Sequence, residues 1–114
     1  MSRQPDVYLN DMLGAIEKIQ RYTSKMSYES FAKDELVQDA TIRNLEILGE
    51  AAKKIPDEIK LAYPNVEWKK VAGLRDILIH DYFGIDTVII WDVVQNKLPE
   101  LQKSLRKIAK DFLR

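Results

Sequence analysis

Apolar residues recur at steps of three and four along three stretches of the chain, as they do on the buried face of an α-helix. The first stripe follows Pro5 and consists of Leu9, Met12, Ile16, Ile19 and Met26. The second consists of Val37, Thr41, Leu45, Leu48, Ala52 and Ile55. The third consists of Trp91, Val94, Leu98, Leu101, Leu105, Ile108 and Phe112. Each stripe predicts a long amphipathic helix with one face in a core.

Residues that begin or end helices stand at the ends of these stripes. Pro5 suits the first turn of the first helix. Asp34 and Asp86 are suitable N-caps for the second and the last helix, because a short side-chain oxygen can accept from the free N–H groups of the first turn. Gly73 permits a bend and Gly84 a stop, so residues 74–83 are expected to form a separate helical segment.

Shorter helical pieces are expected between the long ones. Residues 27–30 interrupt the first pattern and are expected to start a short turn of helix. Pro56 ends the second helix or begins a short one that runs through Ala62, and residues 63–65 are typical of a turn. Residues 68–72 are expected to form another short helix.

Pro99 lies inside the third stripe, where a proline costs about 3 kcal/mol if it sits in a helix interior. We therefore expect a kink or break near residues 96–98, with Pro99 in the first turn of the helix beyond it. Residues 87–91 have β propensity, but they follow a cap and join the helical stripe. The fold class predicted is all-α, an up-down bundle of four or five helices, with residues 1–114 as one domain.

Composition limits the classes of function. The chain has 114 residues, of which 18 are basic and 18 acidic, so its formal net charge is zero. This balance argues against a protein that coats nucleic acid by bulk charge, although a locally basic site remains possible. A core of this size is modest, so oligomerisation would add stability. The basic residues from Lys97 to Arg114 are most simply a solvated face, with RNA or an acidic partner as the alternative.

The sequence also excludes several kinds of chemistry. There are no cysteines, so disulfides, thiolate catalysis and zinc–cysteine sites are absent. The polar start of the chain does not resemble a signal peptide, and no apolar run approaches the roughly 20 residues that span a bilayer. We expect a cytoplasmic protein without a membrane segment. There is one histidine, so a reaction that needs two such groups requires a second chain or another residue type.

That histidine lies in residues 74–84, LRDILIHDYFG. On an ideal helix of about 100° per residue, Arg75 and Tyr82 lie about 20° apart, nearly stacked along the axis. Asp76 and His80 form an i,i+4 pair. His80 lies about 140° from Arg75, within reach of the long arginine side chain. These polar residues face away from the side formed by residues 74, 77 and 78.

The residue types suggest phosphate chemistry. Arg75 can hold a phosphate with its charged fork. His80 can take or give a proton near neutral pH, and Asp76 can fix its tautomer. RNA carries its own nucleophile, the 2′-hydroxyl, so a base, an acid and an arginine would suffice to cleave it without a metal. If this helix pairs across a dimer axis, one histidine per chain becomes two, in a composite site at the interface.

The simpler interpretation is that these side chains lie at the surface and at the edge of the core. When an arginine, a histidine and a tyrosine occur on one amphipathic helix, they are more often surface and core-edge residues than members of a functional site. Trp68 and Trp91 are better interpreted as core residues than as groups that stack on a ligand.

A family resemblance changes this balance. Arg75, His80 and Tyr82 form the pattern Arg-x(4)-His-x-Tyr, which resembles the motif of HepT-like proteins of the HEPN superfamily. Residues 43–52, RNLEILGEAA, resemble the family's second-helix signature, and residues 68–74, WKKVAGL, resemble its lead-in to the motif. Residues 81–86, DYFGID, and the pair WD at 91–92 resemble the family's sequence after the motif. The resemblance covers almost the whole chain.

The resemblance implies a four-to-five-helix HEPN-like bundle, a homodimer, and a metal-independent ribonuclease that acts as the toxin of a toxin–antitoxin pair. Arg75 and His80 would be catalytic, with Asp76 and Tyr82 in support. The partner implied is a minimal nucleotidyltransferase antitoxin of the MntA type, which can transfer AMP from ATP onto the motif tyrosine, Tyr82. Such an AMP would place bulk and charge along the helix face that carries Arg75.

One position departs from the family, and three others invite a role. Asp76 stands where the family often has asparagine, which lowers the local positive potential. Arg43 and Glu50 are seven residues apart, hence on one helix face, and Asn44 is adjacent to Arg43. They are expected to have a structural or supporting role, as salt bridges or as residues that shape the cleft.

Two other classes of function compete with the ribonuclease. One is a non-catalytic partner and AMPylation target of a nucleotidyltransferase, for which loss of the motif arginine or histidine would be the expected sign; both are present. The other is a nucleotide-binding helical module, but the chain has no glycine-rich phosphate loop and no acidic metal cluster. No cofactor or metal is predicted.

Overall fold

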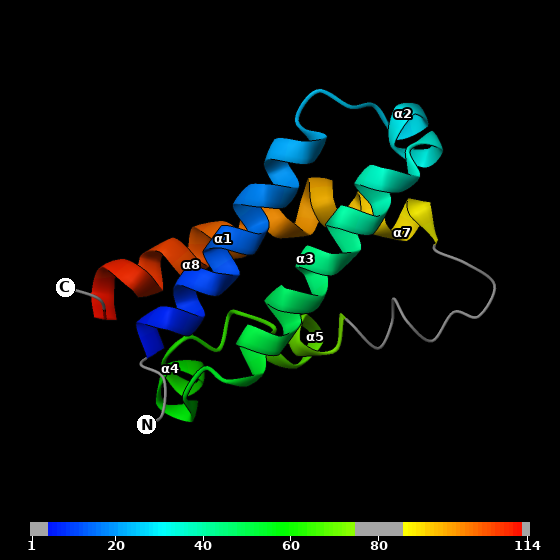
Figure 1. Cartoon of the computed structure of the whole chain (residues 1–114). Helices are drawn as coiled ribbons and strands as arrows, with labels where there is room; N and C mark the ends of the chain where they lie inside the picture. The colour runs from blue at the N-terminus through cyan, green and yellow to red at the C-terminus, as the bar shows by residue number, and fades with distance from the viewer. Residues whose placement is uncertain (1–4, 75–85, 113–114) are drawn as a thin grey trace.

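The protein is seen here in a computed structural model that describes residues 5–74 and 86–112. The described part of the chain is helical and contains no β-strand, which confirms the all-α class. Its longest helices are α1 (Pro5–Thr23), α3 (Glu35–Lys53) and α8 (Leu98–Phe112). α1 and α3 run in opposite directions side by side, and α8 lies against α1 (Figure 1).

The three predicted stripes form the core. Leu9, Met12, Ile16 and Ile19 of α1 are fully buried, and so are Thr41, Leu45, Leu48 and Ala52 of α3. Val94, Leu98, Leu105 and Ile108 of the third stripe are buried as well. Other members of the stripes are less covered: Met26, Val37, Trp91 and Leu101 are half-buried, and Phe112 is exposed. Helical periodicity therefore predicted most of each buried face, and how far the other members are covered depends on what packs against them.

The short helices stand where the sequence predicted them. α2 (Tyr28–Lys33) begins at Ser27, whose side chain accepts from the backbone N–H of Ser30, while the Ser30 hydroxyl accepts from that of Ser27. This reciprocal pair satisfies two donors of the first turn. α4 (Asp57–Ala62) follows Pro56, and α5 (Trp68–Ala72) follows the turn at residues 63–65. Both lie near the C-terminal end of α3 (Figure 1).

The two aspartates predicted as N-caps are caps. Asp34 Oδ1 accepts from the Val37 backbone N–H at 3.0 Å, at the start of α3. Asp86 Oδ1 accepts from the backbone N–H groups of Val88 at 3.0 Å and Ile89 at 3.2 Å, at the start of α7 (Thr87–Asp92). The segment with β propensity, residues 87–91, is therefore helical, as its cap predicted.

Pro99 is accommodated by a change of helix type. The chain passes from α7 through a π-helical segment, Val93–Lys97, into α8 without a gap. The Leu98 N–H donates to the Val93 carbonyl, five residues back, and Pro99 is the second residue of α8. A proline ring clashes with the carbonyl four residues before it, and the wider π turn relieves that crowding. The irregularity expected near residues 96–98 is thus a π-bulge and not a break.

Both tryptophans have core roles, as predicted. Trp68 is 8% exposed, and its Nε1 donates to the Tyr63 carbonyl oxygen at 3.1 Å. Trp91 is half-buried and packs on Phe31 of α2, with ring centroids 5.2 Å apart. The first contact holds α5 to the turn before it, and the second joins the short helices α7 and α2.

Candidate functional site

The motif residues Arg75, Asp76, His80 and Tyr82 lie outside the described residues, so their predicted arrangement stays a prediction. The structure does describe how the chain is held on either side of them. Leu74, directly before the motif, is partly buried against the hydrophobic core. Asp86, shortly after it, caps α7.

The approach to the motif is fixed by close contact between α5 and α3. Gly49 of α3 faces the end of α5, and a Cβ atom there would lie 3.2 Å from the Val71 carbonyl oxygen and 3.3 Å from that of Ala72. These separations are shorter than ordinary van der Waals contact, so a larger residue would push α5 away. Gly49 belongs to the segment that resembles the family's second helix, but its role depends on a partner 22 residues away in sequence and could not be seen there.

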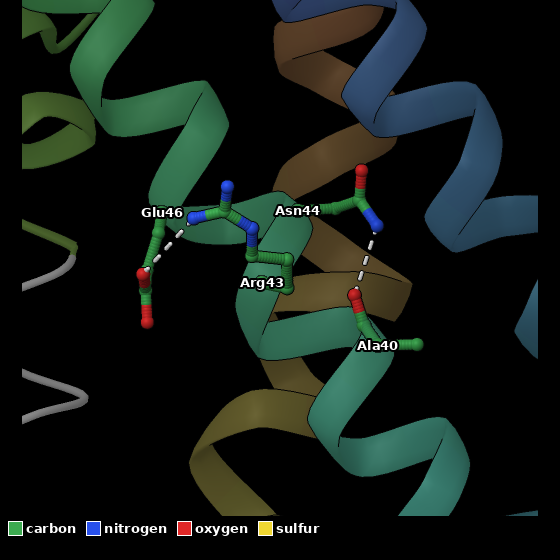
Figure 2. A network of polar contacts seen from close by, with 4 residues as sticks. All are labelled: Ala40, Arg43, Asn44 and Glu46. Atoms are coloured by element: carbon green, nitrogen blue, oxygen red, sulfur yellow. Dashed lines mark hydrogen bonds and ion pairs between the residues drawn. The ribbon is translucent and has the colours of Figure 1, made fainter.

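A first hollow, of about 370 Å³, lies along α1 and α3. We call it the mixed-charge hollow; it is lined by Tyr8, Asp11, Arg43, Glu46, Ile47, Glu50, Ala51 and Lys54. Both Arg43 and Glu50 line it, which confirms that they share one helix face. Arg43 Nη1 lies 3.8 Å from Glu46 Oε2, one turn along α3, as Figure 2 shows. Its side chain is 71% exposed, so this pair is a weak surface interaction.

Asn44 lies on the other side of α3 from its neighbour Arg43 (Figure 2). It is 6% exposed, and its Nδ2 donates to the Ala40 carbonyl oxygen at 2.9 Å, one turn back in the same helix. The structure therefore places Asn44 apart from the hollow that Arg43 and Glu50 share. A role for any of the three in shaping a site remains a prediction.

A second hollow, of about 660 Å³, lies where the end of α3 meets α4, α5 and the turn between them. We call it the lysine hollow; it is lined by Lys53, Asp57, Lys60, Pro64, Val66, Glu67, Trp68, Lys69, Lys70 and Ala72. The sequence analysis did not single out these lysines. Two of them, Lys69 and Lys70, stand in the WKKVAGL segment directly before the motif, and this was the available signal.

Part of the positive charge in the lysine hollow is neutralised by neighbouring glutamates. Lys70 Nζ lies 2.6 Å from Glu67 Oε2. This hydrogen bond and the attraction between the two charges raise the pKa of Lys70 and lower that of Glu67 from their ordinary values. Lys53 Nζ lies 3.5 Å from Glu50 Oε1, which belongs to the mixed-charge hollow.

A third hollow, of about 530 Å³, runs between α5 and the π-helical segment with the start of α8. Its apolar lining includes Val71, Leu74 and Val93, and its edge is polar. Asn65 Nδ2 donates to Ser104 Oγ across this edge at 3.4 Å. Leu74 lines this hollow and precedes Arg75, so the chain enters the motif from beside it.

Within residues 5–74 and 86–112, no group of three or more histidine, cysteine, aspartate or glutamate side chains is placed to hold a metal ion. Among the described helices, none has the length and apolar character needed to cross a bilayer.

Comparison with known proteins gives one consistent result. The family model described as "Ribonuclease HepT-like" matches residues 12–108, which confirms the resemblance carried by the motif. "Putative RNase MJ0127" of Methanocaldococcus jannaschii is 46% identical over 92% of this chain and 87% of its own length. "Putative RNase MJ0125" of the same organism is 41% identical over 96% of this chain and 95% of its own length. "Probable ribonuclease HepT" of Thermococcus cleftensis is 41% identical over 96% of this chain and all of its own. No solved structure gives a significant match.

Proposed function

We propose that this chain, which belongs to the HepT-like ribonuclease family, is a metal-independent endoribonuclease that acts in the cytoplasm as the toxin of a toxin–antitoxin pair. The observation that carries the proposal is the extent of the family match. It spans residues 12–108 and so includes Arg75, His80 and Tyr82 in the order and spacing of the motif. Loss of the arginine or histidine would have favoured a non-catalytic role.

The reaction proposed uses the 2′-hydroxyl of RNA as nucleophile. His80 of one chain takes the proton from the 2′-oxygen, which attacks the adjacent phosphorus. The bond from phosphorus to the 5′-oxygen breaks, and that oxygen takes a proton from the second histidine. The products are a 2′,3′-cyclic phosphate and a free 5′-hydroxyl. Arg75 stabilises the charge that grows on the phosphate oxygens, and Asp76 orients the imidazole.

The second histidine must come from a second copy, because each chain has one. We therefore propose a homodimer with a composite site on its axis, where both copies present the same face. In each copy Leu74 packs against the core and Asp86 caps α7, so the chain is held on both sides of the motif segment.

Mixing subunits tests the composite site. Wild type and His80→Ala are combined in varying ratio, allowed to exchange subunits, and assayed for RNA cleavage with EDTA present. If both histidines serve one site, activity falls with the square of the wild-type fraction. A linear decrease, or a strictly monomeric protein in sedimentation equilibrium, would contradict the composite site.

We also propose that a nucleotidyltransferase antitoxin controls the enzyme through Tyr82. An AMP on the tyrosine oxygen would carry a phosphate to the helix face of Arg75 and occupy the place of the substrate phosphate. The test is incubation with the cognate nucleotidyltransferase and ATP, followed by intact mass. We expect wild type to gain one AMP and lose cleavage, and Tyr82→Phe to gain none. An equal mass gain in Tyr82→Phe would exclude this residue.

A further inference from the structure

The lysine hollow departs from the charge balance of the chain. The whole sequence carries 18 basic and 18 acidic residues, yet this hollow is lined by four lysines and two carboxylates. The mixed-charge hollow is lined by two basic and three acidic residues. A local excess of positive charge therefore lines this hollow, at the end of the described bundle where α4 and α5 lie in Figure 1.

Two of the four lysines are not held in an ion pair by another described residue. Among the described residues, Lys60 and Lys69 make no ion pair, whereas Lys53 and Lys70 pair with Glu50 and Glu67. A lysine ammonium is a compact charge on a flexible stem that binds phosphate as a point charge. A hollow of about 660 Å³ is large enough to admit one or two nucleotides along its length.

The lining favours contact with a phosphate backbone over contact with bases. Trp68 is the one aromatic residue of the lining, but only 8% of it is exposed, and its Nε1 donates a hydrogen bond to the Tyr63 carbonyl oxygen. It forms a wall of the hollow and offers little ring surface on which a base could stack. Contacts to phosphate hold a nucleic acid in place without reading its sequence.

The hollow is also close to the motif by chain connectivity alone. Ala72 lines it and precedes Arg75 by three residues, which can span at most about 11 Å. A strand of RNA whose scissile phosphate is held by Arg75 therefore has this hollow within the reach of a neighbouring nucleotide.

We propose that the lysine hollow binds the phosphate backbone of single-stranded RNA beside the scissile phosphate, with Lys60 and Lys69 as the principal contacts. The proposal rests on the proposed ribonuclease function and adds to it a substrate-binding surface outside the motif. The binding is electrostatic and independent of the RNA sequence, so the affinity falls as the salt concentration rises.

The test measures binding and cleavage separately. The full-length dimer is titrated with a fluorescein-labelled 2′-O-methyl oligoribonucleotide, which lacks the nucleophile, over a range of salt concentrations. Lys60→Gln/Lys69→Gln is compared with Lys18→Gln/Lys25→Gln, which removes the same charge from two exposed positions outside the hollow, one in α1 and one just after it. We expect the hollow variant to lose about tenfold in affinity and its log–log salt slope to fall by about 1.4, and the control to match wild type.

Charge-preserving variants protect the test against misfolding. Lys60→Arg/Lys69→Arg is expected to keep the wild-type affinity and slope, and all variants are checked by thermal melting. If the glutamine variant binds as tightly as wild type with the same slope while wild type cleaves RNA, the hollow proposal is wrong and the ribonuclease proposal stands. If wild type neither binds nor cleaves RNA, the ribonuclease proposal fails and this one with it. If polyglutamate binds through these lysines and RNA does not, the hollow is a site for an acidic protein and the proposal is overturned.

Discussion

The mixed-charge hollow and the lysine hollow differ in how their charges are arranged. In the mixed-charge hollow the acidic residues outnumber the basic ones, and Arg43 is paired with Glu46 one turn away. In the lysine hollow the basic residues outnumber the acidic ones by two to one. The neighbours Lys53 and Lys54, at the end of α3, point into different hollows. A net charge of zero over the chain therefore conceals a local excess that the fold creates.

This contrast indicates different roles for the two hollows. A self-compensated surface such as the mixed-charge hollow has little long-range attraction for a polyanion, because opposite charges cancel within a few ångströms. A surface that keeps a net positive charge, as the lysine hollow does after Lys53 and Lys70 are paired, attracts phosphate from a distance and releases counterions when it binds phosphate. On this basis the lysine hollow contributes to substrate binding, and the residues of the mixed-charge hollow contribute mainly to the surface of the bundle.

The largest change is expected from Gly49→Ala, because Gly49 contacts the end of α5, where Ala72 lines the lysine hollow and Val71 lines the third hollow. The added Cβ would crowd the Val71 and Ala72 carbonyls and displace α5, which leads into the motif. We expect a loss of about 1–3 kcal/mol in the free energy of unfolding and at least a severalfold loss of RNA cleavage. The measurements are urea denaturation and a cleavage assay at a temperature where both proteins are folded.

Gly14→Ala is the matched control for that substitution. Gly14 also lies in a helix, but a Cβ there would meet nothing within 4 Å. Alanine should therefore stabilise α1 by about 0.5–1 kcal/mol and leave cleavage unchanged. If the two variants behave alike, the close contact between α3 and α5 is not what positions the motif.

A smaller effect should separate the adjacent lysines at the end of α3. Lys53→Gln removes one charge from the lysine hollow, and Lys54→Gln removes one from the mixed-charge hollow. Because Glu50 already offsets part of the charge of Lys53, we expect Lys53→Gln to weaken binding of the 2′-O-methyl RNA by less than about threefold and to lower its salt slope by less than about 0.7. Lys54→Gln should leave both unchanged. Equal losses in the two variants would mean that RNA does not distinguish the hollows.

The smallest effect is expected from Glu67→Gln, which should tighten RNA binding about twofold by releasing Lys70 from its ion pair. Lys70 lowers the pKa of Glu67 below its ordinary value of 4.5. The carboxylate therefore stays charged at any pH above that value, and the stabilising effect of the pair is lost only as pH falls through the lowered pKa.

Mild acidification should for that reason not reproduce the effect of Glu67→Gln. Binding is compared at about pH 7 and about pH 5 in a His80→Ala background, which removes the histidine titration. The difference between Glu67→Gln and its parent should be the same at both values. A difference that disappears near pH 5 would show that Glu67 is already protonated there, contrary to the lowered pKa.

The sequence predicted what depends on neighbours along the chain. Leu9, Met12 and Ile16 are buried because their spacing places them on one face, whatever packs there. Asp34 and Asp86 are caps because the donors they satisfy lie two or three residues ahead. Residues 87–91 are helical because their cap and stripe agree, which outweighs the β propensity of the individual residues.

The sequence could not predict what depends on distant partners. The lysine hollow combines the end of α3 with α4, α5 and the turn before it, and these meet only in the folded chain. Gly49 acquires its role from α5, and helix spacing alone does not identify that contact. Arg43 and Glu50 were correctly assigned to one face, yet nothing in their spacing indicated that Lys54 would share their hollow and Lys53 would not.

The most direct test of the proposed ribonuclease is cleavage of total cellular RNA, with EDTA present, by the purified wild type and by His80→Ala. We predict that wild type cleaves with EDTA present and that His80→Ala is slower by at least about 100-fold, with an unchanged melting temperature. Cleavage by His80→Ala at the wild-type rate would contradict the proposal, as would loss of wild-type cleavage on adding EDTA. Absence of cleavage by a wild-type protein whose intact mass excludes AMP on Tyr82 would contradict it equally.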